Sequence, residues 1–552
     1  MSQKELQLIP LSSLAKVFPN KIYGKAHRYV QAAHGQEISF QIAYRHTHSF
    51  HRKIYAVKAS TSIKRAVTLH KVGVVPSSFS AYALGRSDDN YLTKEPGLFP
   101  DPLYPIEDGC VTSSAGSWSC VWVTVKLDDG IKAGKYPIKI VFTNTATGYE
   151  QSVTYTIEVM PYTLPAQKLL FAQWFHCDCI ADAHHVDVFS EAHWSLIDRY
   201  MRLATEHGMN VILTPVVTPP LDTAVGAERP TVQLVEITKT DAGYQFDFSR
   251  LARYVKMALA AGFCAFEINH FFTQWGATSA PKVVAWVDGE EKRIFGWDTD
   301  AAGEEYSAFL GQLVPALIDA FAALGVSRDQ LWFHVSDEPS IQHLEQYHKV
   351  SAILKPLIKG CHHFDALSKV EFYTNGSVES PVPGINHIEP FLEAGVPNLW
   401  CYYCCSQCVD VSNRFFSMPS SRNRIIGVQM YKYNIAGFLQ WGYNFYYTQY
   451  SAKKINPYVV TDADCAFPSG DAFSVYPYGD GAISSLRQKV FANALEDIRL
   501  LTLLEEKIGR ERVIEAIDRI AGMDVTFKSY PKHDGYFDEL YAFIFDELNK
   551  NK

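Results

Sequence analysis

Two adjacent carboxylates, Asp337 and Glu338, are the residues whose types and spacing most suggest chemistry. They come shortly after the apolar run 331–333, and Pro339 follows them directly. Because neighbouring side chains on a regular strand point to opposite faces, the pair could serve one site only where the strand ends. Two carboxylates at the carboxyl end of a strand suit acid and base work on a glycosidic bond. The structural alternative is that Asp337 caps the next helix and Glu338 lies in its first turn.

The strand before this pair belongs to a long series of alternating strands and helices. A helix expected near 191–207, for example, has an apolar face and ends at Gly208. Repeated βα units over about 320 residues predict a (β/α)8 TIM-like barrel for residues 166–505. We expect its strands at 169–175, 210–217, 265–270, 331–335, 370–374, 398–404, 437–441 and 473–476.

The regions on either side of the barrel have other patterns, so we expect a multidomain α/β and β fold. Val121, Val123 and Val125 alternate with other residues, a turn follows at 128–130, and helical periodicity is nearly absent before residue 160. Short strands with frequent turns predict an N-terminal β-sandwich domain over residues 1–160. Prolines at both ends of 161–165 indicate a stiff linker. Residues 506–552 should form a helical C-terminal tail packed on the barrel.

The active site of a (β/α)8 barrel lies at the carboxyl ends of its strands, and these ends carry polar and aromatic residues here. Asp337 and Glu338 follow the fourth expected strand. From their positions at other strand ends, we expect four residues to bind substrate: His176, Asp178, Asn375 and Asn444.

Composition indicates a large globular protein that does not bind nucleic acid. The chain has 552 residues, of which 47% are hydrophobic and 20% charged, which is enough for a sizeable core. Its net charge is −8 and no basic block occurs, so nucleic acid is an unexpected partner. Aromatic residues reach 13%, and sugar sites use such rings because a ring face packs on the C–H face of a pyranose.

Cysteine content and the N-terminal sequence predict a cytoplasmic protein without a membrane partner. The first 14 residues lack the continuous apolar core of a signal peptide, and no apolar run reaches 18 residues. The eleven cysteines, an odd number, are expected to be free thiols in a reducing compartment. The oligomeric state stays open.

No metal or cofactor is predicted. Cys401, Cys404, Cys405 and Cys408 form overlapping C-x-x-C pairs, but zinc needs four convergent ligands, usually on turns, and these lie on or just after an apolar strand. We expect them to be buried thiols. Phosphate-binding glycine loops and a nucleophile-elbow serine are absent from the sequence.

An ordered series of motifs resembles a known family, the group called domain of unknown function 4091, which includes glycoside hydrolase family 123, the β-N-acetylgalactosaminidases. The resemblance covers roughly residues 160–505. Its motifs are Phe175-His176-Cys177-Asp178, Ser336-Asp337-Glu338-Pro339, Trp400-x-Tyr402-x-x-Cys405, Gly437-Phe438-Leu439-x-Trp441 and Gly470-Asp471-Ala472-Phe473-x-Val475-Tyr476-Pro477.

The resemblance implies a retaining hydrolase that removes a terminal N-acetyl-β-hexosamine, with galactosamine expected, from an oligosaccharide or glycoconjugate glycan. The substrate's own 2-acetamido oxygen would attack the anomeric carbon. Asp337 would orient that group, and Glu338 would protonate the leaving oxygen and later activate water. By similarity, Tyr402 and Trp441 would wall the acetamido pocket. No protein nucleophile is then needed, which explains why the two carboxylates can be neighbours.

Two other functions are compatible with the same residues. A glycosidase could use a protein carboxylate, Glu267 or Asp178, as its nucleophile and act on a sugar without an acetamido group. Alternatively, the barrel could bind carbohydrate without catalysis. The preference between galactosamine and glucosamine, the linkage and the aglycone stay open, because the two sugars differ only at the 4-hydroxyl.

Overall fold

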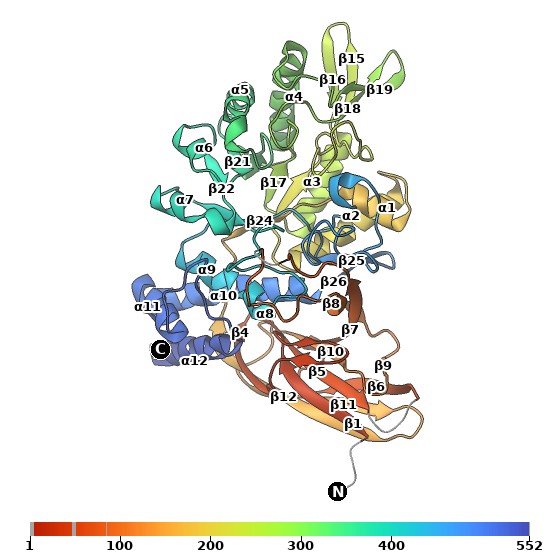
Figure 1. Cartoon of the computed structure of the whole chain (residues 1–552), viewed down its shortest axis with the longest axis vertical. Helices are drawn as coiled ribbons and strands as arrows, with labels where there is room; N and C mark the ends of the chain where they lie inside the picture. The colour runs from red at the N-terminus through yellow and green to blue at the C-terminus, as the bar shows by residue number, and fades with distance from the viewer. Residues whose placement is uncertain (1–4, 47–50, 84–85, 551–552) are drawn as a thin grey trace.

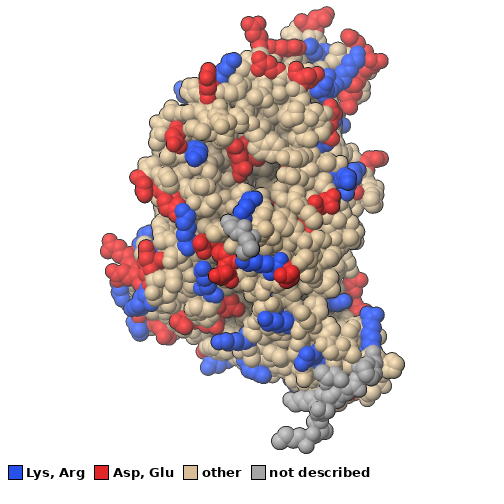
Figure 2. All heavy atoms as spheres, in the orientation of Figure 1, with Lys and Arg blue, Asp and Glu red and all other residues tan. Residues whose placement is uncertain are grey.

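The computed structural model describes residues 5–46, 51–83 and 86–550. Sheets of the N-terminal part lie at one end of the molecule, the barrel at the other, and the C-terminal helices beside both (Figure 1). Both signs of charge mix over the face shown in Figure 2.

Two five-stranded sheets form the N-terminal part and share a core. Phe40 and Val123 of one sheet pack with Ile140 and Ile157 of the other, as the alternating pattern of the sequence requires. Trp122 is also buried, because the opposite face of its strand packs on the C-terminal helices. The strand orders are β1 (Leu6–Ser12), β5 (Glu37–His46), β10 (Ser119–Lys126), β7 (Val67–Ser77), β8 (Gly97–Pro105), and β4 (Tyr29–His34), β12 (Glu150–Thr163), β11 (Gly134–Asn144), β6 (Lys53–Ser60), β9 (Cys110–Ser113).

Eight parallel strands form a nearly closed barrel. A bridge between Gly384 and Tyr402 links the two edge strands. In spatial order the strands are β22 (Ser380–Val382), β21 (His362–Ala366), β20 (Leu331–Phe333), β17 (Ala265–Ile268), β14 (Val211–Thr214), β13 (Leu170–Gln173), β24 (Gly437–Gln440) and β23 (Trp400–Tyr402). The helices around and after it are α1 (Cys177–His184), α2 (Glu191–Thr205), α3 (Ser249–Ala261), α4 (Glu304–Ala323), α5 (Leu344–Leu354), α6 (Glu371–Thr374), α7 (Glu389–Glu393), α8 (Ser420–Arg424) and α9 (Ile426–Lys432).

Two of the expected barrel strands are wrong. Residues 371–374 form helix α6, and the strands there are β21 and β22. The sequence of β21 lacks an apolar pattern, and one of its buried residues is Asp365. This carboxylate can be buried because polar partners satisfy it. The expected strand at 473–476 is instead β25 (Val475–Tyr478), which pairs antiparallel with β26 (Gly481–Ser484) outside the barrel.

Two hairpins extend the barrel at the far end of the molecule (Figure 1). They form one four-stranded sheet from β15 (Glu236–Thr240), β16 (Gly243–Asp247), β18 (Val283–Val287) and β19 (Glu290–Phe295). Beside them, α4 is long and apolar enough to cross a membrane by length and composition, with a mean hydropathy of 1.3. Phe309, Leu313 and Leu317 of α4 are fully buried, as expected of a core helix.

The C-terminal helices join the two parts. Helices α10 (Leu486–Ile508), α11 (Arg510–Ala521) and α12 (Gly535–Lys550) share one apolar cluster with the first sheet. Leu500 and Leu504 of α10 pack there with Leu11 and Trp122. The sheet-rich N-terminal region, the eight parallel strands and the helical tail agree with the predicted order of parts.

A buried ion pair connects these parts. Asp101 of β8 accepts two hydrogen bonds of 2.8 Å from Arg487 of α10 and one of 2.6 Å from Tyr476. Asp101→Asn would leave the Arg487 charge without its counter-ion, so we expect the free energy of unfolding to fall by about 3–5 kcal/mol. Denaturation in urea, followed by circular dichroism, measures this change.

The control is Asp480→Asn, which breaks the exposed pair of Asp480 with Arg199. It should cost much less, because water screens exposed ion pairs. An equal loss in both variants would contradict the importance of the buried pair.

Candidate active site

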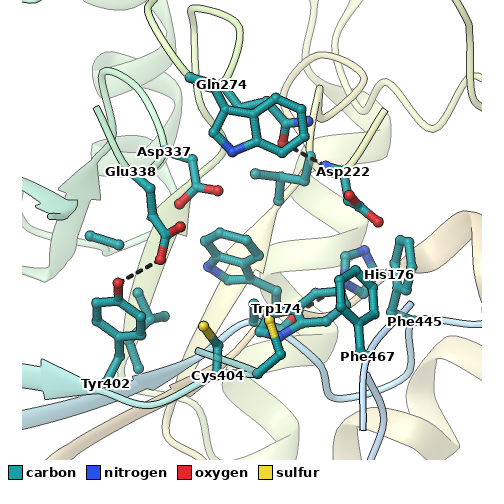
Figure 3. Close-up of a pocket in the computed structure, with 16 residues that line it drawn as sticks. Trp174, His176, Asp222, Gln274, Asp337, Glu338, Tyr402, Cys404, Phe445 and Phe467 are labelled. Atoms are coloured by element: carbon teal, nitrogen blue, oxygen red, sulfur yellow. Dashed lines mark hydrogen bonds between the residues drawn. The ribbon is translucent and has the colours of Figure 1, made fainter. Parts of the chain in front are cut away.

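One pocket lies at the carboxyl ends of the barrel strands and contains the predicted carboxylates (Figure 3). Its empty space is about 670 Å³, which includes the open solvent at its mouth. Acidic side chains lie beside a hollow in the upper half of the molecule (Figure 2). The pocket is lined by Trp174, His176, Leu221, Asp222, Gln274, Trp275, Asp337, Glu338, Ala366, Tyr402, Cys404, Cys405, Leu439, Trp441, Phe445 and Phe467.

Asp337 and Glu338 lie where regular strand geometry has ended after β20, so that both side chains line the pocket. Glu338 has a φ of 42°, which is strained for a residue with a side chain. Its N–H donates to the Ala366 carbonyl at 3.1 Å, and the Asp337 carbonyl accepts from the Trp275 N–H at 3.2 Å. The structural alternative is not found, because Ser340, not Asp337, is the N-cap of the next helical turn, 341–343.

The environment of both carboxyls favours their protonated forms. Burial, and then the charge of Glu338, raises the pKa of Asp337 well above its ordinary value. Burial also raises the pKa of Glu338, although the residue keeps exposure to the open pocket and a hydrogen bond from Tyr402 acts in the opposite direction. That bond joins Tyr402 Oη to Glu338 Oε1 at 2.5 Å. A carboxyl with a raised pKa can act as a proton donor near neutral pH.

A buried charged triad lies beneath this pair. His334 bonds to Glu267 Oε1 through Nε2 at 2.6 Å and to Asp365 Oδ1 through Nδ1 at 2.8 Å. Burial alone would lower the pKa of the His334 imidazole, but the hydrogen bonds and charges of the two carboxylates raise it to about 9. His334 is therefore a cation between two anions. Asp365 also accepts from the N–H groups of Val335 and Ser336, the residues that lead into Asp337.

His176 reaches the pocket, and Asn444 holds it there. Asn444 accepts from the His176 N–H at 2.9 Å and donates to the His176 carbonyl at 3.0 Å. Burial and the Arg229 charge lower the pKa of His176 to about 3, so its imidazole is neutral. The structure thus places His176 in the pocket wall and Asn444 behind it.

Asp178, expected at the pocket, lies behind its wall. Its two oxygens accept from Arg229 Nε at 2.7 Å and Nη2 at 2.8 Å, and the carboxyl is almost fully buried. Burial alone would raise the pKa of Asp178, but the Arg229 charge and hydrogen bonds lower it. Arg229 Nη2 also lies 3.2 Å from His176 Nδ1. Asp178 therefore supports His176 through Arg229.

Tyr402 and Trp441 line the pocket as expected. Trp441 Nε1 donates to Asp471 Oδ2 at 3.0 Å, so the late motif of the sequence fixes the indole. Burial raises the pKa of Asp471 to about 7. An aromatic wall with few free polar groups suits an apolar substituent such as a methyl group.

The reason for placing Asn375 in the site was wrong, because no strand precedes it. Asn375 follows helix α6, is exposed, and accepts from the Ser377 N–H at 3.0 Å. Ser377 in turn bonds to His348 and Ser351 of the outer helix α5. The structure therefore does not bring Asn375 to the pocket.

The four clustered cysteines are free thiols, and two of them, Cys404 and Cys405, line the pocket. Among the described residues, one buried group has metal-ligand atoms close together: His270, His334 and Asp365. Both nitrogens of His334 already bond to carboxylates, and its ring stacks on His270 with centroids 4.0 Å apart. This group is better described as a charge network than as a cation site.

Two pocket residues lie too far into loops for the strand ends to indicate them. Asp222 follows β14 by eight residues, and Gln274 follows β17 by six. The only signal was their location in loops at the correct end of the barrel. Trp174 was visible at the first strand end, and it donates from Nε1 to Glu267 at 2.6 Å.

Two comparisons with known proteins indicate the same family. The family model "Glycoside hydrolase 123, catalytic domain" matches residues 174–504. A solved family 123 glycoside hydrolase from Clostridium perfringens, described in a study of glycolipid glycan hydrolysis, matches with a TM-score of 0.73 and 15% identity, over 99% of this chain and 98% of that one. No match was found among curated proteins.

Other solved structures match far less well. An endo-β-1,4-mannanase from Thermotoga petrophila has a TM-score of 0.34 and 12% identity, over 61% of this chain and 77% of that one. A β-glucuronidase from Parabacteroides merdae has a TM-score of 0.27 and 11% identity, over 80% and 47%. These two likenesses are too low to support any argument.

The charged triad makes a prediction about stability and pH. The folded pKa of His334 is raised above its unfolded value, so its stabilisation is fully present below about pH 6.5 and lost as the pH rises through about 9. We expect His334→Gln to lower the free energy of unfolding by at least about 1 kcal/mol more at acidic pH than at alkaline pH. Urea denaturation at pH 6 and at pH 9.5 measures the difference. A penalty that grows with pH would contradict it, and His533→Gln at an exposed site is the control.

Proposed function

The chain belongs to the glycoside hydrolase 123 family, whose catalytic-domain model matches residues 174–504 of 552, and from this premise we propose that it is a retaining β-N-acetylhexosaminidase. It would remove a terminal N-acetyl-β-hexosamine, with N-acetylgalactosamine preferred, from a glycan. The 2-acetamido group of the substrate would serve as the nucleophile.

The observation that carries this proposal is that Asp337 and Glu338 are neighbours at one wall of the pocket (Figure 3). A protein nucleophile would have to face the sugar from the side opposite the acid. The two carboxylates considered for that role do not line the pocket: Glu267 is fully buried and bonds to Trp174 and His334, and Asp178 is paired with Arg229. This weighs against a glycosidase that uses Glu267 or Asp178 as its nucleophile.

Glu338 has the properties of the general acid. Burial raises its pKa and so favours the protonated form that a general acid needs. Tyr402 bonds to Oε1, which leaves Oε2 to protonate the glycosidic oxygen. After the aglycone leaves, the same carboxylate would take a proton from the attacking water. The bond from its backbone N–H to the Ala366 carbonyl helps to hold the residue at the pocket wall.

Asp337 would hold the acetamido N–H and stabilise the positive charge of the oxazolinium that forms. Burial and the charge of Glu338 disfavour the ionised form of Asp337, and positive charge that develops beside it would favour that form again. Tyr402, Trp441 and the thiol of Cys404 supply a mostly apolar enclosure for the acetamido methyl. Burial by these groups also excludes water that would compete with the intramolecular attack.

The finer fold class belongs to the same proposal. The parallel order of the strands and the helices between them support a (β/α)8 barrel of the TIM type that follows a β-sandwich. The domain limits 1–160, 166–505 and 506–552 and the cytoplasmic location stay predictions.

The first test concerns the substrate. We expect 4-nitrophenyl N-acetyl-β-galactosaminide to be hydrolysed and the plain β-galactoside to react at least about 10⁴-fold more slowly, because it lacks the internal nucleophile and leaves Asp337 unpaired. Replacing the acetyl hydrogens by one, two and three fluorines should lower kcat/KM stepwise, since fluorine weakens the carbonyl oxygen as a nucleophile. Comparable rates on both sugars would favour a protein nucleophile instead.

The second test separates the two carboxylates. Glu338→Gln should slow hydrolysis of natural glycans by about 10²–10⁴-fold, but slow the first step much less when the leaving group is dinitrophenolate, which departs without a proton. Asp337→Asn should keep a slow first step with every leaving group. Burst-phase kinetics isolates that step. The same leaving-group dependence in both variants would refute the division of roles. If both variants fold and keep normal activity, Asp337 and Glu338 are not the catalytic residues.

A further inference from the structure

We propose that Asp222, positioned by Gln274, binds the hydroxyl at the C4 edge of the terminal sugar and sets the choice between the galacto and gluco epimers. This inference rests on the proposed function, because it takes the sugar to be an N-acetylhexosamine whose C1 faces Glu338.

Asp222 and Gln274 come from different loops and meet at the pocket wall. The Asp222 N–H donates to Gln274 Oε1 at 2.6 Å. Oδ2 of Asp222 accepts from the Tyr450 N–H at 3.1 Å, and no hydrogen bond within the described part of the chain uses the other oxygen, Oδ1. Both residues line the pocket. The loops are therefore locked to each other while the carboxylate keeps a free acceptor.

Gln274 contributes an unused donor. Its side chain is 6% exposed, and within the described residues its Nε2 has no hydrogen-bond partner. The amide cannot simply be turned around, because Nε2 would then face the Asp222 N–H, another donor. Buried donors without a partner are rare in proteins and call for an explanation, and one explanation is a ligand. A hydroxyl both donates and accepts, so a carboxylate oxygen beside an amide donor is its complement.

The position of Asp222 and Gln274 in the pocket indicates which edge of the sugar they would contact. Asp337 and Glu338 lie on one side of the Trp174 indole and Asp222 with His176 on the other (Figure 3). A pyranose whose C1 faces Glu338, packed on the indole, directs C4 to the opposite wall, since C1 and C4 lie across the ring. The two epimers differ in the direction of the hydroxyl at that carbon. A rigid acceptor there can favour one of them.

The conformation of Asp222 supports a binding role and makes a clean variant possible. Its φ is 40°, a backbone region that Asp and Asn occupy more readily than most other residues. Burial raises the pKa of Asp222 to about 6, so the carboxylate is mostly ionised at neutral pH and accepts hydrogen bonds. Asp222→Asn keeps the shape and the backbone preference but removes the charge.

The test compares 4-nitrophenyl N-acetyl-β-galactosaminide with its glucosaminide epimer in the full-length chain. We expect Asp222→Asn to lower kcat/KM for the preferred epimer by about 10- to 100-fold and for the other only a few-fold, so that the selectivity ratio falls. Gln274→Met, which removes the donor, should shift the ratio in the same direction. Asp319→Asn, an exposed carboxylate on α4, should leave both rates unchanged.

Other outcomes would overturn the inference. An equal loss on both epimers would mean that Asp222 acts on the reaction itself or only on the structure of the loop. No loss would mean that it does not contact the sugar. If the unmodified enzyme cleaves neither epimer, the proposed function fails, and calorimetric titration with the two free sugars then decides the inference separately. Equal effects of Asp222→Asn on the two affinities would refute it.

Discussion

The buried triad of Glu267, His334 and Asp365 is the interaction on which the active-site geometry depends. One imidazolium lies between two carboxylates in the barrel interior, and each carboxylate also fixes part of the pocket. Glu267 orients the Trp174 indole, and Asp365 accepts from the backbone of the two residues before Asp337. Loss of any member would leave an unpaired charge where water cannot compensate for it. Asp337 and Glu338 are therefore placed by the electrostatic interactions below them as much as by the strand.

Around this triad, the carboxyls that line the pocket differ from those that lie behind its wall. Asp337 and Glu338 face the cavity in an environment that disfavours their charges, whereas Asp178 and Asp365 are sealed and keep theirs through cationic partners. Carboxyls of both kinds lie near one another, and their partners decide their roles. His176 belongs to both groups, because its side chain lines the cavity while its backbone is held by Asn444 behind the wall.

Much of the architecture followed from pattern, and the exceptions have physical causes. Strands with mostly apolar sequences, such as β14 and β17, were found near their true places, and the family resemblance was confirmed. The strand β21 was missed because its sequence, HHFDA, is mostly polar, and no sequence pattern reports the contact with His334 that satisfies its buried Asp365. For the same reason Asp178 was expected to be free, since its partner Arg229 lies 51 residues away. Asp222 and Gln274 belong to loops without periodicity.

The contacts of Arg487 have a consequence for how this enzyme could be rebuilt or recombined. Besides Asp101 of the N-terminal sheets, Arg487 bonds to the carbonyl of Gly470, and the next residue, Asp471, holds the Trp441 indole. A short series of hydrogen bonds thus connects the first sheet to the pocket. A chimaera that paired this barrel with foreign sheets would have to recreate that series. The N-terminal part is therefore a structural component of the enzyme and not an exchangeable module.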